Sequence, residues 1–472
     1  MEHKYTNITA DSRKVQQGSI FVAVKGYSAD GHDYIRTALD KGAACIVYED
    51  EAKVSQLAAE RPDIDWIKTP NSRKALAEKA SEFYGHPSRS IKLVGITGTN
   101  GKTTTVTLLH DLFTSMGYKC GLLSTIANYV AGERFEAVNT TSDPVTINAL
   151  LRRMVDEGCE YCFMEVSSIG LEQDRVWGLE YKVGIFSNLT HDHLDYHKTF
   201  AEYLRCKKLF FDNLGKDAIA ITNIDDRNGL IMTQNTKAKV VTYSCRRPAD
   251  HTARILEESF EGMLMKVDGT QMWFPLIGQH NAYNALAIYS AAVALGAEKE
   301  EVLVGMSKVG QVCGRLEVMK GKDGVSVVID YAHTPDALEN VLRTLREIAP
   351  ERKLCCLFGC GGDRDKTKRP EMGAMAAKMA DKVVITSDNS RTENTSDIIA
   401  DIKAGIEPQY MKKVMSVEDR REAIRIAIMT AVPQETILLA GKGHEDYQII
   451  GKEKRHFDEH EVVAEIFKEM EI

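Results

Sequence analysis

The sequence has no uninterrupted apolar run of roughly 18 residues, the length that a helix needs to cross a bilayer. Its first residues are polar and charged, without the apolar segment of a secretory signal. Low-complexity segments and long proline, serine or glycine tracts are lacking too, and 43% of the 472 residues are hydrophobic. We therefore expect a globular protein of the cytoplasm that does not bind a membrane.

An excess of positive charge is also lacking. Lysine and arginine number 60 against 68 aspartates and glutamates, and the formal net charge is -8. The two signs are interspersed, whereas a nucleic-acid binder normally presents a basic face. Ten cysteines in a chain of this length do not indicate a disulfide framework, and we expect them to be reduced. Because a basic face is not indicated, nucleic acid is not an expected partner. We also expect the protein to be a monomer.

The chain is too long for one hydrophobic core, and three blocks can be separated: residues 1–88, 89–314 and 315–472. Short apolar strands alternate with helical segments, which predicts mostly parallel sheets covered by helices. Predicted strands include residues 19–24, 43–48, 91–97, 325–329, 354–358, 383–386 and 437–440, and predicted helices include residues 35–41 and 335–348. The expected fold is three α/β domains, the second with a parallel sheet and a phosphate loop and the third Rossmann-like.

The sharpest local signal is a glycine-rich loop between the strand at residues 91–97 and an amphipathic helix. The loop reads Gly98, Thr99, Asn100, Gly101, Lys102, Thr103 and Thr104. Glycines let backbone N–H groups turn toward a phosphate, and the helix N-terminus adds partial positive charge. Lys102 can contact the β- and γ-phosphates of ATP, and the Thr103 hydroxyl can bind Mg²⁺. The strict phosphate-loop signature would need glycine in place of Ile96, so a plain turn with a surface lysine is the alternative.

This compact loop and its run of threonines resemble those of the Mur ligase family. In that family the loop threonine, the glutamate of an E-V-S-S strand and the histidine of a D-H-L-D segment hold magnesium ions, and a later lysine is carbamylated. The corresponding residues of this chain are Thr103, Glu165, His193 and Lys207. An unmodified lysine ammonium would repel Mg²⁺, whereas a carbamate on the same side chain would offer it an oxygen ligand. The alternative for Lys207 is an ordinary solvated lysine on a helix.

The segment around His193 also imitates a metal signature of metallo-β-lactamase-type hydrolases. That signature needs histidine where this chain has Tyr196, and such hydrolases lack a phosphate loop. Cys159 and Cys162 have a zinc-like spacing, but no second pair matches them and they adjoin an apolar stretch, so we expect core cysteines. This sequence departs from the family pattern at Ile169, where many relatives have histidine.

Three further family motifs have counterparts that imply an ATP site completed by two domains. The family's adenine contact matches Asn281, its γ-phosphate contact matches Arg315, and its ribose contacts match Asp330 and Tyr331. An arginine on a transferring phosphoryl group is worth on the order of 10²–10³ in rate. Arg315 begins the third block, so domain closure could complete the site. For Asp330 and Tyr331 the alternative is a strand-end turn before a helix. The residues expected to be catalytic are Lys102, Lys207 and Arg315.

Over its whole length the chain most resembles the family branch that adds the third peptide residue to UDP-N-acetylmuramoyl-L-alanyl-D-glutamate. The resemblance implies that residues of the first block face the UDP group and that polar residues of the second face the muramoyl-dipeptide. The first set is Ser12, Tyr27, Ser28 and Ala29, and the second is Asn139, Thr140, Thr141, Ser167, Gln173 and Arg175. The alternative for the first set is ordinary turn and cap chemistry.

The third block has three loops after predicted strands, where doubly wound folds bind ligands. Their candidate amino-acid-binding residues are Arg364, Asp388, Asn389, Ser390, Arg391, Gly441 and Glu445. Meso-2,6-diaminopimelate is lysine with one more carboxylate, which suits the two guanidinium groups, while Glu445 suits its distal ammonium. With lysine, a desolvated Arg391 would lose its partner at a cost of about 3–5 kcal/mol. We therefore expect diaminopimelate rather than L-lysine, although Ser390 stands where diaminopimelate enzymes usually have proline. A surface loop arginine is the alternative for Arg391.

The implied reaction joins an amino acid to a carboxylate through an acyl phosphate and uses ATP and Mg²⁺. The expected partners are ATP, the UDP-N-acetylmuramoyl-dipeptide and meso-diaminopimelate. A folylpolyglutamate synthetase would share the second and third blocks without needing the first. A non-catalytic P-loop switch would need neither the two arginines nor the loop that contains Glu445. Both rivals stay open on the sequence alone.

Overall fold

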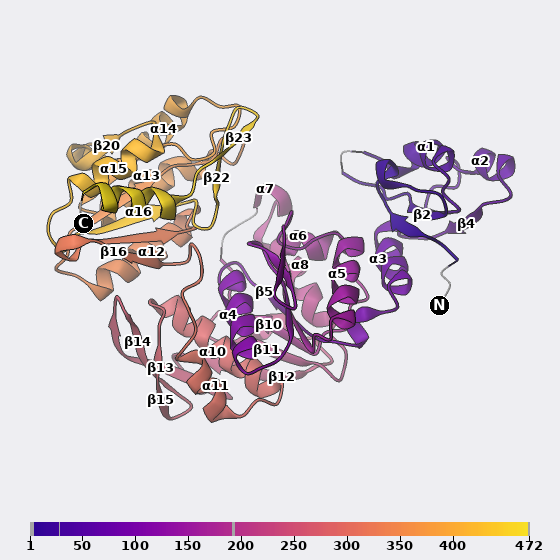
Figure 1. Cartoon of the computed structure of the whole chain (residues 1–472), viewed down its shortest axis with the longest axis horizontal. Coiled ribbons are helices and arrows are strands. Elements are labelled where there is room, and N and C mark those ends of the chain that lie inside the picture. The colour runs from indigo at the N-terminus through magenta and orange to yellow at the C-terminus, as the bar shows by residue number, and fades with distance from the viewer. Residues whose placement is uncertain (1–3, 28, 191–193, 471–472) are drawn as a thin grey trace.

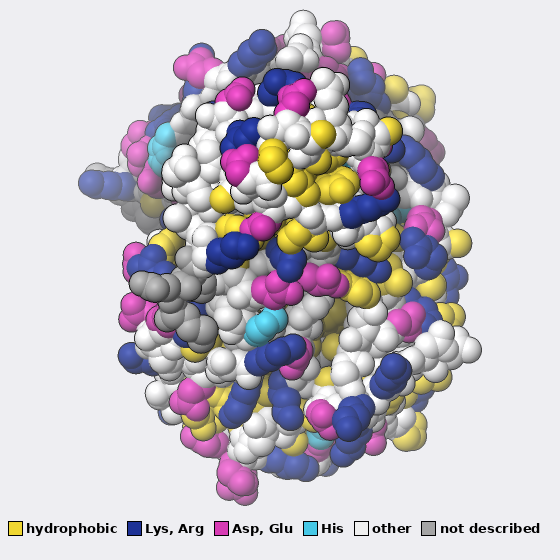
Figure 2. Space-filling view, turned by 90° about the vertical axis from the view of Figure 1, so that its right-hand side faces the viewer, with side chains coloured by type: hydrophobic (Ala, Val, Ile, Leu, Met, Phe, Trp, Pro, Cys, Tyr) yellow, Lys and Arg dark blue, Asp and Glu magenta, His cyan; other side chains and the backbone are white. Residues whose placement is uncertain are grey.

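The computed structural model describes residues 4–27, 29–190 and 194–470, so Ser28 and His193 of the predicted sites lie outside the described residues. Figure 1 shows three α/β bodies, with the middle body between the other two. On the face that carries the N-terminal body, basic and acidic side chains are intermixed (Figure 2). Within the described part of the chain, no helix is both long and apolar enough to span a membrane.

The N-terminal domain is built on a parallel sheet of β1 (Asn7–Thr9), β2 (Ser19–Val22), β3 (Cys45–Tyr48) and β4 (Asp65–Lys68), in that order. Alternate side chains of a strand face opposite sides of the sheet. Phe21 therefore packs in one apolar cluster with α1 (Ile35–Asp40), and Val22 packs in another with α3 (Ser72–Phe83). The short helix α2 (Ser55–Glu60) precedes β4, and α3 packs on α5 (Pro144–Asp156) of the middle domain.

The middle domain contains an 11-stranded sheet with a parallel centre. That centre is, in spatial order, β12 (Lys239–Ser244), β11 (Ile219–Asn223), β10 (Val183–Phe186), β5 (Lys92–Thr97), β9 (Tyr161–Glu165) and β6 (Cys120–Leu123). Antiparallel strands β7 (Asn128–Val130) and β8 (Glu133–Phe135) extend one edge. The other edge continues into β13 (His251–Ser259), β14 (Gly262–Val267) and β15 (Thr270–Phe274).

Helices cover both faces of this sheet. One face packs against α4 (Lys102–Ser115), α10 (Gln279–Ala294) and α11 (Lys299–Met306). The other packs against α5, α6 (Ser168–Glu172) and α8 (Phe200–Asp212), while α7 (Leu194–His197) and α9 (Gly229–Met232) are short. Cys159 and Cys162 are buried in this second cluster, which confirms the prediction that they are core cysteines.

The C-terminal domain has a six-stranded sheet with a doubly wound order. The strands are β16 (Glu317–Lys320), β17 (Ser326–Asp330), β21 (Thr436–Ala440), β18 (Leu354–Phe358), β19 (Lys382–Ile385) and β20 (Val414–Ser416), and only β16 is antiparallel to its neighbour. One face is covered by α12 (Pro335–Ile348), α13 (Lys368–Met379) and α14 (Thr395–Lys403), the other by α15 (Arg420–Met429) and α16 (Glu459–Glu469). A hairpin of β22 (Tyr447–Ile450) and β23 (Glu453–His456) follows β21.

A buried ion pair holds the strand ends that carry the predicted amino-acid loops. Arg420 and Glu459 are both fully buried and lie 2.7 Å apart. Arg420 also donates to the backbone oxygens of Ser387, just after β19, and of Ala440, the last residue of β21. The pair thus ties α15 and α16 to the edge of the sheet where ligands bind in such folds.

Replacing Arg420 by alanine is expected to destabilise the C-terminal domain by about 3 kcal/mol, because Glu459 would keep a buried charge without its partner. Hydrogen exchange of the amides in β19 and β21 measures this change. Arg421→Ala is the matched control, since Arg421 forms an exposed ion pair with Glu465 that is worth about 1 kcal/mol or less. Equal exchange rates in the two variants would contradict the structural role of the buried pair.

Candidate active site between the middle and C-terminal domains

The phosphate loop needs glycine at its two predicted positions. Gly101 has a φ of 88°, in the left-handed region, and a Cβ there would lie 2.3 Å from Asn284 Oδ1. A Cβ at Gly98 would lie 1.9 Å from Ser187 Oγ. Gly101 leads directly into α4, and the N–H groups and dipole of a helix N-terminus attract an anion. The loop therefore has the backbone form of an anion cradle.

Two lysines converge on this loop from different helices. Lys102 Nζ donates to the backbone oxygens of Gly98 at 2.9 Å and Thr99 at 2.8 Å. Lys207 Nζ, from α8, donates to the same Gly98 oxygen at 2.8 Å. Lys207 is 1% exposed, so the alternative of a solvated helix lysine is wrong.

Glu165 and Thr103 form an oxygen-rich corner beside the loop. Glu165 Oε1 accepts hydrogen bonds from Thr103 Oγ1 at 2.9 Å and from the Thr125 N–H at 2.8 Å. Glu165 Oε2 is buried and has no hydrogen-bond partner among the described residues. A buried carboxylate oxygen left unpaired beside a hydroxyl fits a hard cation such as Mg²⁺, which prefers oxygen ligands. These residues fit the predicted metal site.

A cavity of about 680 Å³ lies between the middle and C-terminal domains. It brings together most of the residues predicted for ATP and for the dipeptide. Those that line it are Thr99, Asn100, Gly101, Lys102, Thr103, Thr104, Asn139, Thr140, Thr141, Glu165, Ser167, Arg175, Lys207, Asn281, Arg315, Asp330 and Tyr331. Ile169 lines it too, so an apolar side chain faces the cavity at the position where the family resemblance leads us to expect histidine.

Arg315 reaches across the domain boundary. Its Nη2 lies 3.4 Å from Thr103 Oγ1, its guanidinium stacks over the Tyr331 ring at 4.9 Å, and its Nε has no partner among the described residues. By contrast, both carboxylate oxygens of Asp330 already accept backbone N–H groups, from Leu316 and Ala332 at 2.8 Å. Asp330 thus fixes the turn after β17, which is the structural role that the alternative interpretation predicted for it.

Four of the six residues predicted for the dipeptide form one network with the end of β9. Thr141 Oγ1 donates to the backbone oxygen of Glu165 and accepts from the Ser167 N–H, both at 2.9 Å. Arg175 donates to the Thr141 backbone oxygen at 2.7 Å and to the Gln173 side chain at 2.8 Å. This network places polar groups beside the phosphate loop.

Of the predicted UDP contacts, Ser12, Tyr27 and Ala29 lie in the N-terminal domain and do not line the cavity. Ser12 is buried, whereas Tyr27 is 67% exposed and its hydroxyl donates to Glu172 of α6 at 2.5 Å. Tyr196 donates to the other oxygen of Glu172 at 2.6 Å. Sequence reasoning missed Glu172 and its link to Tyr27, because nothing in the local pattern marks a contact between domains.

The three predicted amino-acid loops meet at the carboxyl ends of β18, β19 and β21. Arg391 has a φ of 51° and donates through Nη1 to the Gly362 oxygen at 2.8 Å. A Cβ at Gly361 would contact both Arg391 and Arg364, so the two predicted arginines flank the same glycine. Arg364 is exposed. Asp388, Asn389 and Ser390 are buried, and Gly441 has a φ of 116°.

Lys442 is a residue of this site that the sequence reasoning missed. It is fully buried, and its Nζ lies 3.3–3.4 Å from side-chain oxygens of Asp388, Asn389 and Glu445. Burial alone would raise the pKa of Asp388, but Lys442 and Arg420 keep it below its ordinary value. Burial raises the pKa of Glu445, although Lys442 opposes the shift. Asn389 Nδ2 also donates to Glu445 at 2.9 Å. The ammonium of Lys442 thus already lies among these oxygens.

Arg369 holds the arginine-bearing loops in place through Glu393. Arg369 is buried and donates to both oxygens of Glu393 at 3.0 Å and to the Gly361 oxygen at 3.1 Å. Arg369 and Lys366 lower the pKa of Glu393 to about 2. A carboxylate whose pKa is lowered by folding stabilises the fold at any pH above its pKa in the unfolded state. That stabilisation is lost as the pH falls through its pKa in the folded state.

We expect Glu393→Gln to lower the free energy of unfolding at pH 7 by about 1–3 kcal/mol. The difference from the unsubstituted protein should shrink as the pH falls from about 4.5 through 2, because the carboxylate is protonated in both states only below the folded pKa. Urea unfolding followed by circular dichroism across this range measures it. Glu453→Gln, at an exposed ion pair with Arg455, is the control, and a difference that does not change with pH would refute the account.

Three family profiles match this chain in order: "Mur ligase family, catalytic domain" over residues 4–84, "Mur ligase middle domain" over residues 96–293 and "Mur ligase, glutamate ligase domain" over residues 314–443. A curated relative from Phocaeicola vulgatus, named UDP-N-acetylmuramoyl-L-alanyl-D-glutamate–2,6-diaminopimelate ligase, is 49% identical over 98% of this chain and 95% of its own length.

Solved structures agree with these profiles. A structure of a UDP-N-acetylmuramoyl-L-alanyl-D-glutamate–2,6-diaminopimelate ligase is 31% identical, covers 99% of this chain and 96% of its own, and has a TM-score of 0.71. A Mycobacterium tuberculosis folylpolyglutamate synthase complexed with ADP and AMPPCP shares the fold at 19% identity and a TM-score of 0.64, over 83% of this chain and 95% of its own. The geometry of the phosphate loop, the full-length relatives and the three consecutive profiles agree: this chain belongs to the Mur ligase family.

Proposed function

We propose that the chain is an ATP-dependent amide ligase that adds meso-2,6-diaminopimelate to UDP-N-acetylmuramoyl-L-alanyl-D-glutamate in peptidoglycan precursor synthesis. The full-length relative at 49% identity carries that name. We assign UDP binding to residues 1–88, ATP binding to residues 89–314 and amino-acid binding to residues 315–472. Because ATP is the co-substrate, we place the reaction in the cytoplasm.

The observation that carries the choice of amino acid is the arrangement of charge at the carboxyl ends of the C-terminal strands. Two guanidinium groups, Arg364 and Arg391, flank Gly361. The half-buried carboxylate of Glu445 accepts a hydrogen bond from Asn389, whose backbone oxygen accepts one from Arg391. A substrate with a carboxylate and an ammonium at its distal end matches both signs of charge. L-Lysine would leave the arginines without a carboxylate.

The residues of the cavity have separate tasks in the proposed reaction. The γ-carboxylate oxygen of the D-glutamyl residue attacks the γ-phosphorus of ATP, and ADP leaves. Lys102 and Arg315 then balance the charge that develops on the phosphoryl oxygens. The amine of diaminopimelate attacks the acyl carbon, and phosphate leaves as the amide forms and the amine loses its proton.

The predicted metal ligands fit this scheme. Thr103, Glu165 and Lys207 as a carbamate would hold Mg²⁺, together with the predicted ligand His193. When bound, Mg²⁺ neutralises phosphate charge and orients the nucleotide. The carbamate of Lys207 would hold metal and would not transfer a proton. Thr141 and Arg175, beside Glu165, orient the dipeptide carboxylate.

Phosphate release tests the function. Purified protein with ATP, Mg²⁺, the UDP-dipeptide and meso-diaminopimelate should release phosphate, and omission of either the dipeptide or the amino acid should stop it. Release that needs neither would indicate a P-loop ATPase or switch. Failure to bind the UDP-dipeptide, together with turnover of a folate substrate, would favour the folylpolyglutamate-type ligase.

A further inference from the structure

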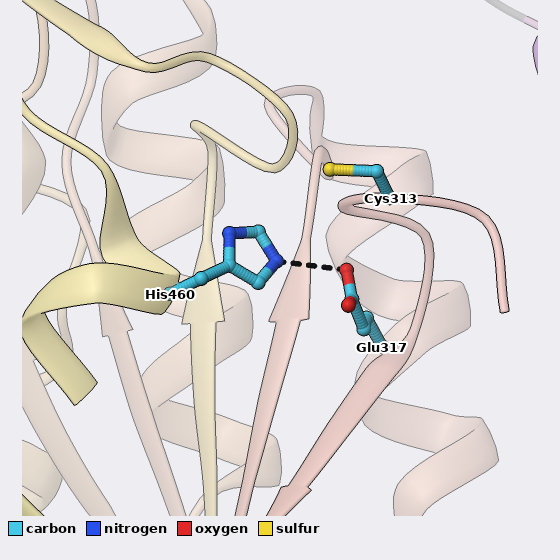
Figure 3. A group of neighbouring side chains, drawn as sticks. All are labelled: Cys313, Glu317 and His460. Carbon is cyan, nitrogen blue, oxygen red and sulfur yellow. Dashed lines mark hydrogen bonds and ion pairs between the residues drawn. The ribbon is translucent and has the colours of Figure 1, made fainter. Parts of the chain in front are cut away.

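A cluster of three different metal-binding side chains lies outside the proposed active site, at the connection between the middle and C-terminal domains. Cys313 precedes β16, Glu317 begins it, and His460 comes from the first turn of α16. The Cys313 sulfur, a Glu317 carboxylate oxygen and a His460 ring nitrogen all lie within 4.8 Å of one another. Figure 3 shows the histidine and the glutamate pointing toward each other, with the cysteine sulfur beside them.

The histidine of this cluster is held in a fixed orientation. Its Nδ1 lies 2.9 Å from Asp458 Oδ1, which turns Nε2 toward Glu317 Oε2 at 2.7 Å. A carboxylate on the far nitrogen is the usual support of a metal-binding histidine, because it fixes the tautomer and makes the near nitrogen a better ligand. Asp458 is itself fixed, since it caps α16 by accepting from the His460 N–H.

We propose that Cys313, Glu317 and His460 form a binding site for a divalent cation of the zinc class. One sulfur, one imidazole nitrogen and one carboxylate oxygen are a donor set that Zn²⁺ and Co²⁺ accept, with a water as the fourth ligand. Mg²⁺ prefers oxygen ligands alone, so the site differs in chemistry from the corner at Glu165. The inference does not depend on the proposed function.

The distances allow such a site after a small adjustment. Ligand atoms around a tetrahedral zinc ion lie about 3.4–3.7 Å apart, given metal–ligand bonds of about 2.0–2.3 Å. The present spread of up to 4.8 Å must close, while the Glu317–His460 pair at 2.7 Å must open. Cys313 is exposed and lies outside helices and strands, so its side chain can move and a cation can enter from solvent.

The charges around the cluster also favour a cation. Glu317 and Asp458 both contact the imidazole of His460, so two carboxylates add negative charge beside the cluster. The alternative occupant is a proton, which makes His460 the positive partner of two carboxylates. Metal and proton would compete for the same nitrogen, so the metal must displace the proton on binding.

The position of the cluster gives the cation a structural consequence. Cys313 and Glu317 lie on either side of Arg315, whose guanidinium reaches Thr103 in the phosphate loop. Gly314 is packed so closely on Gly443 that a Cβ would lie 2.2 Å from its backbone. A cation held by His460 would therefore fix the segment that carries Arg315 to the last helix of the C-terminal domain.

Cobalt titration of the full-length protein tests the site, because a thiolate bound to Co²⁺ gives a sulfur-to-metal charge-transfer band. In excess Mg²⁺, one equivalent of Co²⁺ should produce this band. Added Zn²⁺ should displace the Co²⁺ and remove the band. Cys313→Ser should abolish the band, and His460→Gln should weaken Co²⁺ binding by at least about tenfold. The melting temperature should rise with Zn²⁺ and should not rise in either variant.

Matched controls separate this site from nonspecific thiol binding. Of the ten cysteines, all but Cys313 and Cys245 are buried, so Cys245→Ser should leave the band unchanged. His456→Gln, at an exposed pair with Glu461 just before α16, should leave it unchanged too. No charge-transfer band in the unsubstituted protein, or a band that survives Cys313→Ser, would overturn the proposal and leave His460 as an ion-pair partner only.

Discussion

Replacing Lys207 by alanine is expected to lower the rate of phosphate release by at least about 10²–10³-fold. The side chain is 1% exposed and lies on the Gly98 oxygen of the phosphate loop, so no water-facing lysine can substitute for it. The loss should appear in kcat, because the group acts on charge that develops during phosphoryl transfer. Steady-state kinetics with all three substrates measures it, and added bicarbonate should not restore the variant.

Two further substitutions separate a carbamate from an ammonium at this position. If Lys207 acts as an anionic metal ligand, Lys207→Glu should retain more activity than Lys207→Arg. Enzyme prepared in ¹³C-bicarbonate should show a carbamate carbon signal by NMR that Lys207→Ala lacks. Lys208→Ala is the control, since Lys208 pairs with Asp212 on the same helix and should remain active. Full activity of Lys207→Ala, or greater activity of the arginine variant, would contradict the carbamate proposal.

Replacing Arg391 by lysine is expected to raise the KM for meso-diaminopimelate by about tenfold to a hundredfold while the KM for ATP is unchanged. A substrate carboxylate against this loop would lose its bidentate hydrogen bonding, which costs about 1.5–3 kcal/mol. Lysine keeps the positive charge but cannot donate to Gly362 and to a carboxylate from one planar group. Initial rates at varied diaminopimelate measure the effect.

The preference between amino acids provides the control for this prediction. The ratio of kcat/KM for diaminopimelate to that for L-lysine should fall in Arg391→Lys, because only the first substrate has the extra carboxylate. Arg425→Ala should not change the ratio, since Arg425 forms an exposed pair with Glu469 on α15 and α16. An unchanged KM for diaminopimelate in Arg391→Lys would assign Arg391 to loop structure alone.

Much of the fold follows from local sequence pattern. Buried parallel strands are apolar along their whole length, so residues 354–358 and the helix at residues 335–348 were predicted with the bounds that the structure has. The edge ribbon β13 to β15 was not predicted, because β13 is half exposed and its side chains do not alternate cleanly between apolar and polar. Edge strands depend on pairing with a neighbour that local pattern does not reveal.

Some residues of the candidate site could likewise be predicted from local sequence pattern, and others could not. Residues on the phosphate loop and at strand ends could be predicted because glycine spacing and topology place them, and the cavity brings the phosphate loop together with Glu165, Asp330 and Tyr331. Lys442 and Glu172 could not, since each acts through contacts with residues more than fifty positions away in the chain. Asn281 shows a different limit. Its amide is occupied within and just before α10, by the Ile277 oxygen and by Asn284, so its contact with adenine stays a prediction.

The most direct test of the central claim is a competition experiment. The protein is incubated with ATP, Mg²⁺, UDP-N-acetylmuramoyl-L-alanyl-D-glutamate and equal concentrations of meso-diaminopimelate and L-lysine, and the nucleotide product is identified by mass spectrometry. The account predicts that the diaminopimelate amide is the main product, with one phosphate released per amide. A lysine amide as the main product would contradict the role given to Arg391, and phosphate release without either amide would contradict the proposed ligase itself.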